Sequence, residues 1–221
     1  MNLSELVTEI EDIVQDSSYA EIKIKAKINE AVLAIATGVM IPGKFEKSPP
    51  LPDLYKVDDI DTTVSSGITD LPTDFNRDVV QVLNSDKDEI TINSSAKNFL
   101  HKYLDQDGGE VYVCTIMGKR LLYRDIPSTA ETLTIHYYKT PNTLSANSDE
   151  PDEIPVHLHR KLIVGYVCKE IFDQIEDGIE DPKTNTNHYN NEFQSGLVAL
   201  DLEIGTDENP DHYDDQTDYC A

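Results

Sequence analysis

The sequence contains no tryptophan, only three cysteines, and only 18 lysines and arginines against 42 aspartates and glutamates, so its net charge is −24. Cys114, Cys168 and Cys220 are widely separated and form no CxxC pair, which argues against a zinc site or a disulfide framework. We expect Cys114 and Cys168, which lie in apolar segments, to be core residues. A surface this acidic does not hold nucleic acid by attraction, although it would let DNA pass without binding.

Long hydrophobic runs are missing as well. The longest apolar run, Leu162–Cys168, is much too short to span a bilayer. The first residues, Met1–Glu9, lack the basic start and continuous apolar core of a signal peptide, so we expect synthesis in the cytoplasm. Because 38% of the residues are hydrophobic, the chain can still bury a core.

Motifs for catalysis are also missing: the sequence has no phosphate-binding loop, dinucleotide fingerprint, nucleophile elbow or HExxH. His157 and His159 lie two residues apart on a predicted helix and diverge by about 200°, so they cannot chelate one metal. The acidic segment 207–215 lacks the central glycine and closing glutamate of a calcium loop. We therefore predict no enzymatic activity, no cofactor and no metal site. A glycosidase-like carboxylate pair is the alternative that this composition leaves open, although no pair stands out.

The first 40 residues predict two amphipathic helices. Asn2 and Glu5 have the spacing of a capping box, and apolar residues then recur at helical spacing up to Val14. Ser18 and Glu21 repeat that cap spacing before a second helix, which Gly38 ends. The buried face of this second helix is predicted to contain Ile24, Ile28, Ala31, Val32 and Ile35.

The middle of the chain predicts a small antiparallel β-domain. The proline-rich stretch Ser48–Pro52 marks its beginning, and Gly118-Lys119 has the composition of a tight turn. One short helix is expected over Ala96–Leu104. The predicted strands, which are rich in β-branched and aromatic residues, are Tyr55–Ile60, Thr62–Val64, Asp78–Leu83, Glu89–Asn93, Glu110–Met117, Arg120–Asp125 and Thr132–Lys139.

The last third predicts a second pair of helices. The segment Pro155–Ile175 is apolar on nearly all sides, so we expect it to be covered on both sides, with Gly165 allowing close approach of a neighbour. A final helix carries Tyr189, Phe193, Leu197, Leu200 and Ile204 on one face. The predicted fold is therefore α+β, with a helical bundle from residues 1–50 and 151–205 and an inserted β-domain over 51–150.

Residues 206–221 contain six acidic residues and no lysine or arginine, and they show no apolar periodicity. They are too polar to fold alone, but Tyr213 and Tyr219 have the bulk to anchor on a partner. We therefore predict a partner-binding tail, formed by Asp207, Asp211, Tyr213, Asp214, Asp215 and Tyr219. The alternative is a disordered tail that only increases solubility.

Four segments together resemble the head–tail adaptor (connector) proteins of tailed bacteriophages. They are Leu71–Arg77, the strand pair Leu121–Pro127 and Leu133–Pro141, Asp149–Pro155, and His188–Ser195. The resemblance covers about residues 1–205, because the N-terminal helix pair fits too. It implies a helical bundle with an inserted β-domain and a ring, usually of twelve copies, beneath the portal. The expected partners are the portal protein and a tail or nozzle protein, and DNA would pass through the central channel at the neck of the virion.

Two other functions remain to be separated from a structural adaptor. One is a cell-wall glycosidase that is delivered with the tail. The other is an assembly factor that is absent from the mature particle. Clearing of peptidoglycan would distinguish the first, and the protein content of purified virions would distinguish the second.

Overall fold

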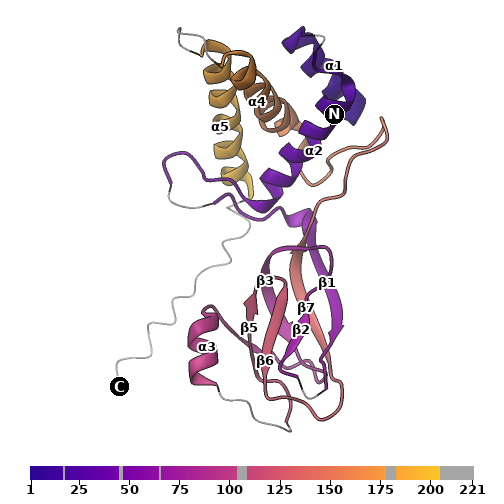
Figure 1. The fold of residues 1–221 in the computed structure, drawn as a ribbon, viewed down its shortest axis with the longest axis vertical. Coiled ribbons are helices and arrows are strands. Elements are labelled where there is room, and N and C mark those ends of the chain that lie inside the picture. Colours follow the sequence, from indigo (N-terminus) through magenta and orange to yellow (C-terminus); the bar gives the residue numbers. More distant parts are fainter. Residues whose placement is uncertain (17, 45–46, 65, 104–108, 178–182, 205–221) are drawn as a thin grey trace. The chain divides into compact units, whose positions relative to one another are not determined.

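The computed structural model describes residues 1–16, 18–44, 47–64, 66–103, 109–177 and 183–204. These residues form α-helices and two small sheets (Figure 1), so the predicted α+β class is confirmed. The chain divides into two compact units. The helical unit contains residues 1–53 and 141–221, and the strand unit contains residues 54–140. The helical unit therefore draws on both ends of the chain.

Helix α1 (Leu3–Val14) begins as the sequence predicts. The Asn2 side chain accepts a hydrogen bond of 2.9 Å from the Glu5 amide, and the Glu5 carboxylate accepts one of 3.0 Å from the Asn2 amide. This reciprocal pair satisfies two amides that the helix itself leaves without partners. The predicted capping box is confirmed.

Helix α2 (Glu21–Thr37) begins differently from the prediction. Its N-cap is Ala20, which offers no capping side chain, so the predicted cap at Ser18 is wrong. Ser18 instead lies in the preceding turn, where its amide donates to the Asp16 carboxylate at 2.8 Å. The predicted buried face is confirmed in full: it contains Ile24, Ile28, Ala31, Val32 and Ile35.

The apolar segment that starts after Pro155 is helical but not one regular α-helix. It contains a 3-10 turn (η2, Val156–Leu158), a π-helical turn (η3, Arg160–Val164) and helix α4 (Gly165–Ile175). Its expected burial is confirmed by six fully or nearly fully covered side chains: Leu158, Leu162, Ile163, Val164, Val167 and Ile171.

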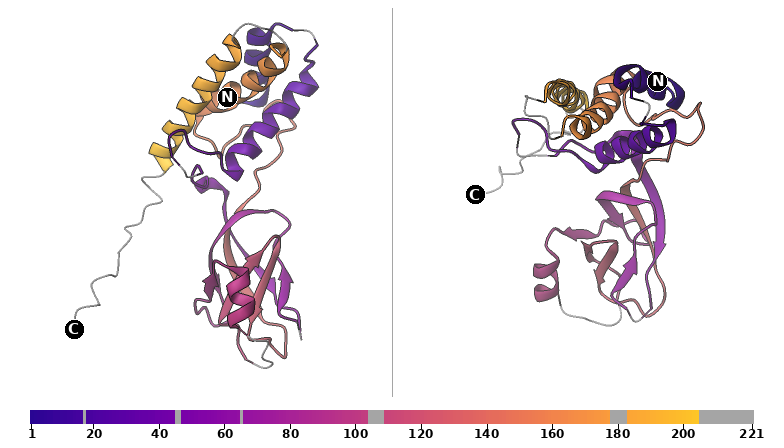
Figure 2. Two further views of the ribbon diagram at one scale, coloured as in Figure 1. Left: turned by 60° about the vertical axis from the view of Figure 1, so that its left-hand side comes forward. Right: turned by 45° about the horizontal axis from the view of Figure 1, so that its top comes forward.

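Glycines set the distance between α4 and α5 (Thr184–Ile204). A Cβ atom on Gly165 would lie 3.2 Å from the Phe193 backbone nitrogen, and one on Gly196 would lie 3.0 Å from Cδ2 of Leu162. The close approach predicted at Gly165 is therefore confirmed. Helix α4 lies between α5 on one side and the α1–α2 pair on the other (Figures 1 and 2).

The strand unit holds two sheets. The first has the order β1 (Tyr55–Asp61), β7 (Thr132–Lys139), β3 (Phe75–Leu83), and all its pairs are antiparallel. The second has the order β2 (Ile68–Asp70), β6 (Arg120–Arg124), β5 (Val113–Met117), β4 (Thr91–Asn93). Strands β5 and β6 form a hairpin through Gly118, whose φ of +66° suits glycine.

The strand unit differs from the prediction in its pairing and in its strands, since β2 was not predicted. Strand β4 pairs in parallel with β5, so the unit is not wholly antiparallel. Helix α3 (Ala96–Lys102) lies between them in the chain and provides the crossover that parallel strands require. The predicted strand Thr62–Val64 is not formed: β1 ends at Asp61, and the Thr63 amide donates to the Tyr123 hydroxyl and not to a neighbouring strand.

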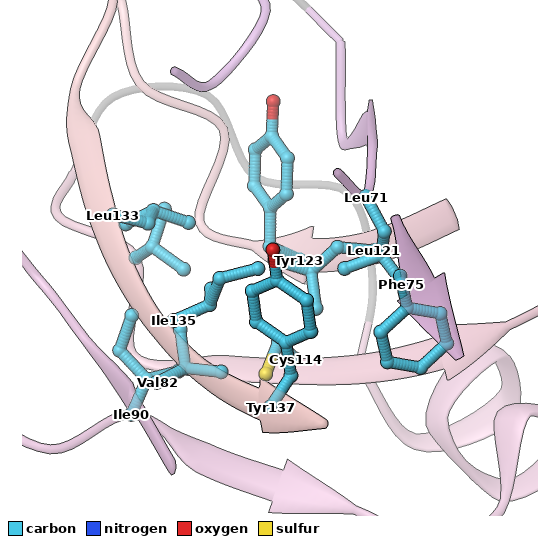
Figure 3. Packing of buried hydrophobic residues seen from close by; sticks show 11 residues of the cluster. Leu71, Phe75, Val82, Ile90, Cys114, Leu121, Tyr123, Leu133, Ile135 and Tyr137 are labelled. Carbon is cyan, nitrogen blue, oxygen red and sulfur yellow. The ribbon is translucent and has the colours of Figure 1, made fainter. Parts of the chain in front are cut away.

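The core of the strand unit combines aliphatic side chains with two tyrosines (Figure 3). Tyr123 and Tyr137 are fully buried, as is Cys114. Burial raises the pKa of the Cys114 thiol to about 12, and the same holds for Cys168 in the helical unit. Both cysteines are core residues, as predicted, whereas Cys220 lies outside the described residues.

Candidate functional site

The predicted partner-binding tail cannot be placed in the fold. Its residues, Asp207, Asp211, Tyr213, Asp214, Asp215 and Tyr219, all lie outside the described part of the chain. Candidate surfaces and reactive groups must therefore be sought in the two units themselves.

The segment Leu71–Arg77, which carries part of the family resemblance, positions a polar network. Asp74 accepts a hydrogen bond of 2.7 Å from the Tyr137 hydroxyl on β7. The Lys56 ammonium on β1 lies 2.9 Å from both Asp74 and Asp58. The segment thus ties the entry of β3 to both other strands of its sheet.

The electrostatics of this network favour a structural role. Burial alone would raise the pKa of Asp74, but hydrogen bonds from Tyr137 and Lys56 outweigh it and lower the pKa. Burial and the bond to Asp74 raise the pKa of Tyr137 to about 12. Hydrogen bonds to Asp74 and Asp58 also raise the pKa of Lys56. All of these groups keep one protonation state near neutral pH, whereas a general acid or base works best when its pKa lies near that pH.

The two neighbouring histidines point to different partners, as their spacing predicts. His159 is buried, with Nδ1 2.9 Å from the Met1 amino group and Nε2 2.8 Å from the Ile154 carbonyl oxygen. His157 is exposed, and its Nε2 lies 3.1 Å from the Glu203 carboxylate. Within the described ranges, no three histidine, cysteine or acidic side chains come together as a metal site.

Exposed apolar side chains on the helical unit are its most evident candidate interaction surfaces. Of the large hydrophobic residues that the structure describes, Ile22 on α2 and Leu202 on α5 are the most exposed, at 77% and 67%. Ile22, Ala26 and Leu33 form the α2 stripe, and Val198 and Leu202 form the α5 stripe. Because each stripe gathers exposed apolar side chains on one face of a helix, the two stripes are candidate contact surfaces.

The strand unit presents a different surface on the outer side of its first sheet. Tyr55 faces Tyr138, and Val57 faces His136, across the β1–β7 pair. The Tyr55 ring lies 5.9 Å from both the His136 and Tyr138 rings, and its hydroxyl bonds to His136 Nδ1. Tyr55 and Val57 are 44% and 47% exposed. We call these four residues the aromatic face.

Sequence reasoning did not select either surface, although a signal was present. Ile22 and Leu33 are apolar residues that do not fall on the predicted buried face of α2, which indicates an apolar position exposed to solvent. On β1, Tyr55 and Val57 alternate with the polar residues Lys56 and Asp58, a pattern that normally predicts burial of the apolar side, but here that side is exposed. Burial of each face depends on the tertiary fold and not on the local pattern.

No helix among the described residues is long and apolar enough to cross a membrane. A comparison with curated proteins gives no match. A family model described as SU10 adaptor protein matches residues 1–213, which include the whole strand unit and all but the last eight residues of the helical unit. The chain therefore belongs to the SU10 adaptor protein family, a family of phage adaptor proteins.

Proposed function

We propose that this protein is a structural component of the virion that forms the head–tail adaptor ring, joining the portal to the tail at the phage neck. The observation that carries the proposal is the match of residues 1–213 to a phage adaptor family. The helical unit built from both ends of the chain, with a separate strand unit between them, agrees with the architecture that the resemblance implies.

The charge of the chain suits a ring around DNA. Each copy has a net charge of −24, so a ring of copies, usually twelve in such adaptors, would carry a strongly negative field. Phosphates of the genome would be repelled from the wall of the channel and would not bind to it. DNA would thus pass through without sequence-specific contact.

Two partners are expected, the portal protein on one side and a tail or nozzle protein on the other. The strand unit offers the aromatic face, and the acidic segment 206–221 offers a second surface. Two separate surfaces are what a protein needs to hold two different partners.

The tail residues Asp207, Asp211, Tyr213, Asp214, Asp215 and Tyr219 are proposed to bind the portal or a neighbouring copy. Tyr213 and Tyr219 would anchor the segment, and the carboxylates would contact basic side chains. Deletion of residues 206–221 should weaken portal binding in titrations at low salt. Unchanged affinity after deletion would leave only a solubilising role for the tail.

Mass photometry of the purified protein, alone and with the portal protein of the same phage, tests the proposed function. We expect a complex in which a defined number of copies joins the portal ring. Mass spectrometry of purified virions should detect the protein in the mature particle. A chain that never joins the portal, or that is missing from virions, would contradict the proposal.

A further inference from the structure

Helix α4 lies between α2 and α5 in the helical unit (Figures 1 and 2). Each stripe lies on the face of its helix opposite the buried side chains, so the two stripes lie on opposite sides of this unit. They also contain the two most exposed large hydrophobic side chains among the described residues, Ile22 and Leu202. A unit with two distinct apolar surfaces on opposite sides can contact two neighbours at once.

The α2 stripe follows one face of its helix. Ile22, Ala26 and Leu33 recur at spacings of four and seven residues, away from the buried face that contains Ile24 and Ile28. The helix Glu21–Thr37 contains three lysines and two glutamates, so its net charge is +1. Lys25 pairs with Glu21 and Lys27 pairs with Glu30, so Lys23 carries the remaining positive charge.

Helix α5, which carries the second stripe, has a net negative charge. Val198 and Leu202 are four residues apart, so they lie on one face of the helix. The helix Thr184–Ile204 contains three acidic residues, one of which (Asp201) pairs with Lys44, and no lysine or arginine. Of these, Glu203 directly follows Leu202 and has a side chain that is 45% exposed. Val156 in η2, beside His157 and its Glu203 contact, is also largely exposed and extends the apolar area near this end of α5.

We propose that the α2 stripe of one copy packs against the α5 stripe of a second copy of this chain. The inference deepens the proposed adaptor ring and rests on it. Pairing α5 with α5 would bring together two helices that each have a net charge of −3, and pairing α2 with α2 would bring together two helices that each have a net charge of +1. Only the mixed pair matches apolar with apolar and joins helices of opposite net charge.

The contact is therefore heterologous, meaning that each copy uses a different surface toward each neighbour. A heterologous contact repeated around an axis closes into a ring when the rotation between copies allows it. An isologous contact would instead stop at a dimer. The placement of the two stripes on opposite sides of the helical unit thus favours the assembly that an adaptor requires.

Two single variants, Ile22→Glu and Leu202→Glu, test this contact in the full-length protein together with the portal protein of the same phage. Each change replaces a mostly exposed side chain, so each variant should keep the wild-type melting temperature. Each alone should weaken self-association at least about tenfold, because an apolar anchor is lost and a charge must be desolvated. Val80→Glu, at an exposed position of the strand unit, is the matched control and should assemble as the wild type does.

Mixing the two variants gives the sharpest outcome. Ile22→Glu keeps an intact α5 stripe, and Leu202→Glu keeps an intact α2 stripe, so an equimolar mixture can form one good contact. In the absence of portal, we expect heterodimers of twice the 24.8 kDa chain mass, whereas each variant alone stays monomeric. Monomers in the mixture, or homodimers of either variant, would overturn the proposal.

The test separates this inference from the proposed function. If wild-type protein assembles on the portal and both variants do so equally well, the ring exists but uses other surfaces, and the inference is wrong. If assembly depends on Leu202 but not on Ile22, α5 is covered by something other than α2, such as residues 205–221 or another protein, and the inference is again wrong. If the wild type never assembles on the portal, the proposed function fails first.

Discussion

The two units of this protein are stabilised in different ways. The largest fully buried side chains of the helical unit are aliphatic: Leu3, Leu6, Ile10, Ile24, Ile28, Ile35 and Leu51. Those of the strand unit include Tyr123 and Tyr137, whose hydroxyl groups bond to the Thr63 backbone and to the Asp74 carboxylate. The largest buried side chains of the helical unit thus contribute packing alone, whereas those of the strand unit include two tyrosines (Figure 3) that also bond to Thr63 and Asp74.

This difference bears on what each unit can offer a partner. Helices that are covered on one face by packing leave the opposite face available for apolar side chains, as the α2 and α5 stripes show. In the strand unit, the hydrogen bonds of the buried tyrosines hold the loops in position. A sheet face that is held in this way suits a preformed contact surface such as the aromatic face. The following predictions test whether the two units differ in this way.

The largest effect is expected from creating a cavity in the helical unit. Leu162 is fully buried where η3 packs against α5, so Leu162→Ala should destabilise this unit by about 2–5 kcal/mol. Hydrogen exchange should accelerate in residues 1–53 and 141–204 and change little in the strand unit. The matched variant Leu121→Ala should produce the reverse pattern. Equal acceleration in both units after either change would show that they are one cooperative body.

A smaller loss is expected from filling the α4–α5 crossing. Gly165→Val places branched carbons against the Phe193 backbone, which cannot move aside as a side chain could, and should cost about 1–3 kcal/mol. Ser195→Val on the exposed side of α5 is the control, and it should change the melting temperature little. A Gly165→Val protein with wild-type stability would mean that the close approach does not limit packing.

Removing a single hydroxyl from the strand unit should cost about 1 kcal/mol. Tyr137→Phe leaves Asp74 without its bond of 2.7 Å, and Tyr123→Phe removes the bonds that hold Thr63. Tyr112→Phe, at a half-exposed position, should be nearly neutral in urea unfolding. If all three variants are as stable as the wild type, the tyrosine hydrogen bonds do not stabilise the strand unit.

The smallest loss of stability is expected on acidification, and it should appear first in the helical unit. Burial, together with the nearby Met1 amino group, lowers the pKa of His159 below its ordinary value of 6.5. The unfolded chain therefore binds a proton that the folded chain does not, so stability falls as the pH drops below 6.5, by at most about 1.4 kcal/mol per pH unit. In the strand unit, the pKa of Asp74 is lowered from 3.8, so this contribution is fully present above pH 3.8 and is lost only below it.

Thermal melting measured between pH 7 and 5.5, with hydrogen exchange to follow each unit separately, checks this order. The variant His159→Gln should reduce the loss in the helical unit without changing the strand unit. Earlier weakening of the strand unit would contradict the assignment of these groups.

The sequence predicted the helices well because their signals are local. The capping box at Asn2 and the apolar spacing of α2 and α4 involve residues within a few positions of one another. The cap at Ser18 was predicted wrongly because Asp16 engages its amide in a turn, and the helix begins three residues later at Glu21. Such competition between a turn and a cap is not visible in spacing alone.

Strand pairing could not be predicted as well because it depends on distant residues. Strand β2 has only three residues, too few for an alternating pattern, and was missed. The parallel pairing of β4 with β5 follows from the path of the chain through α3, which composition does not specify. The candidate surfaces were missed for the same reason, since the exposure of Ile22, Leu202 and Tyr55 is fixed only when the helices and sheets are assembled.

Imaging of purified phage necks by cryo-electron microscopy tests the structural role most directly. The account predicts a closed ring of copies of this chain in contact with the portal, with neighbouring helical units touching and an open channel along the axis. Necks without density for this protein, or with one isolated copy that contacts no neighbour, would contradict it.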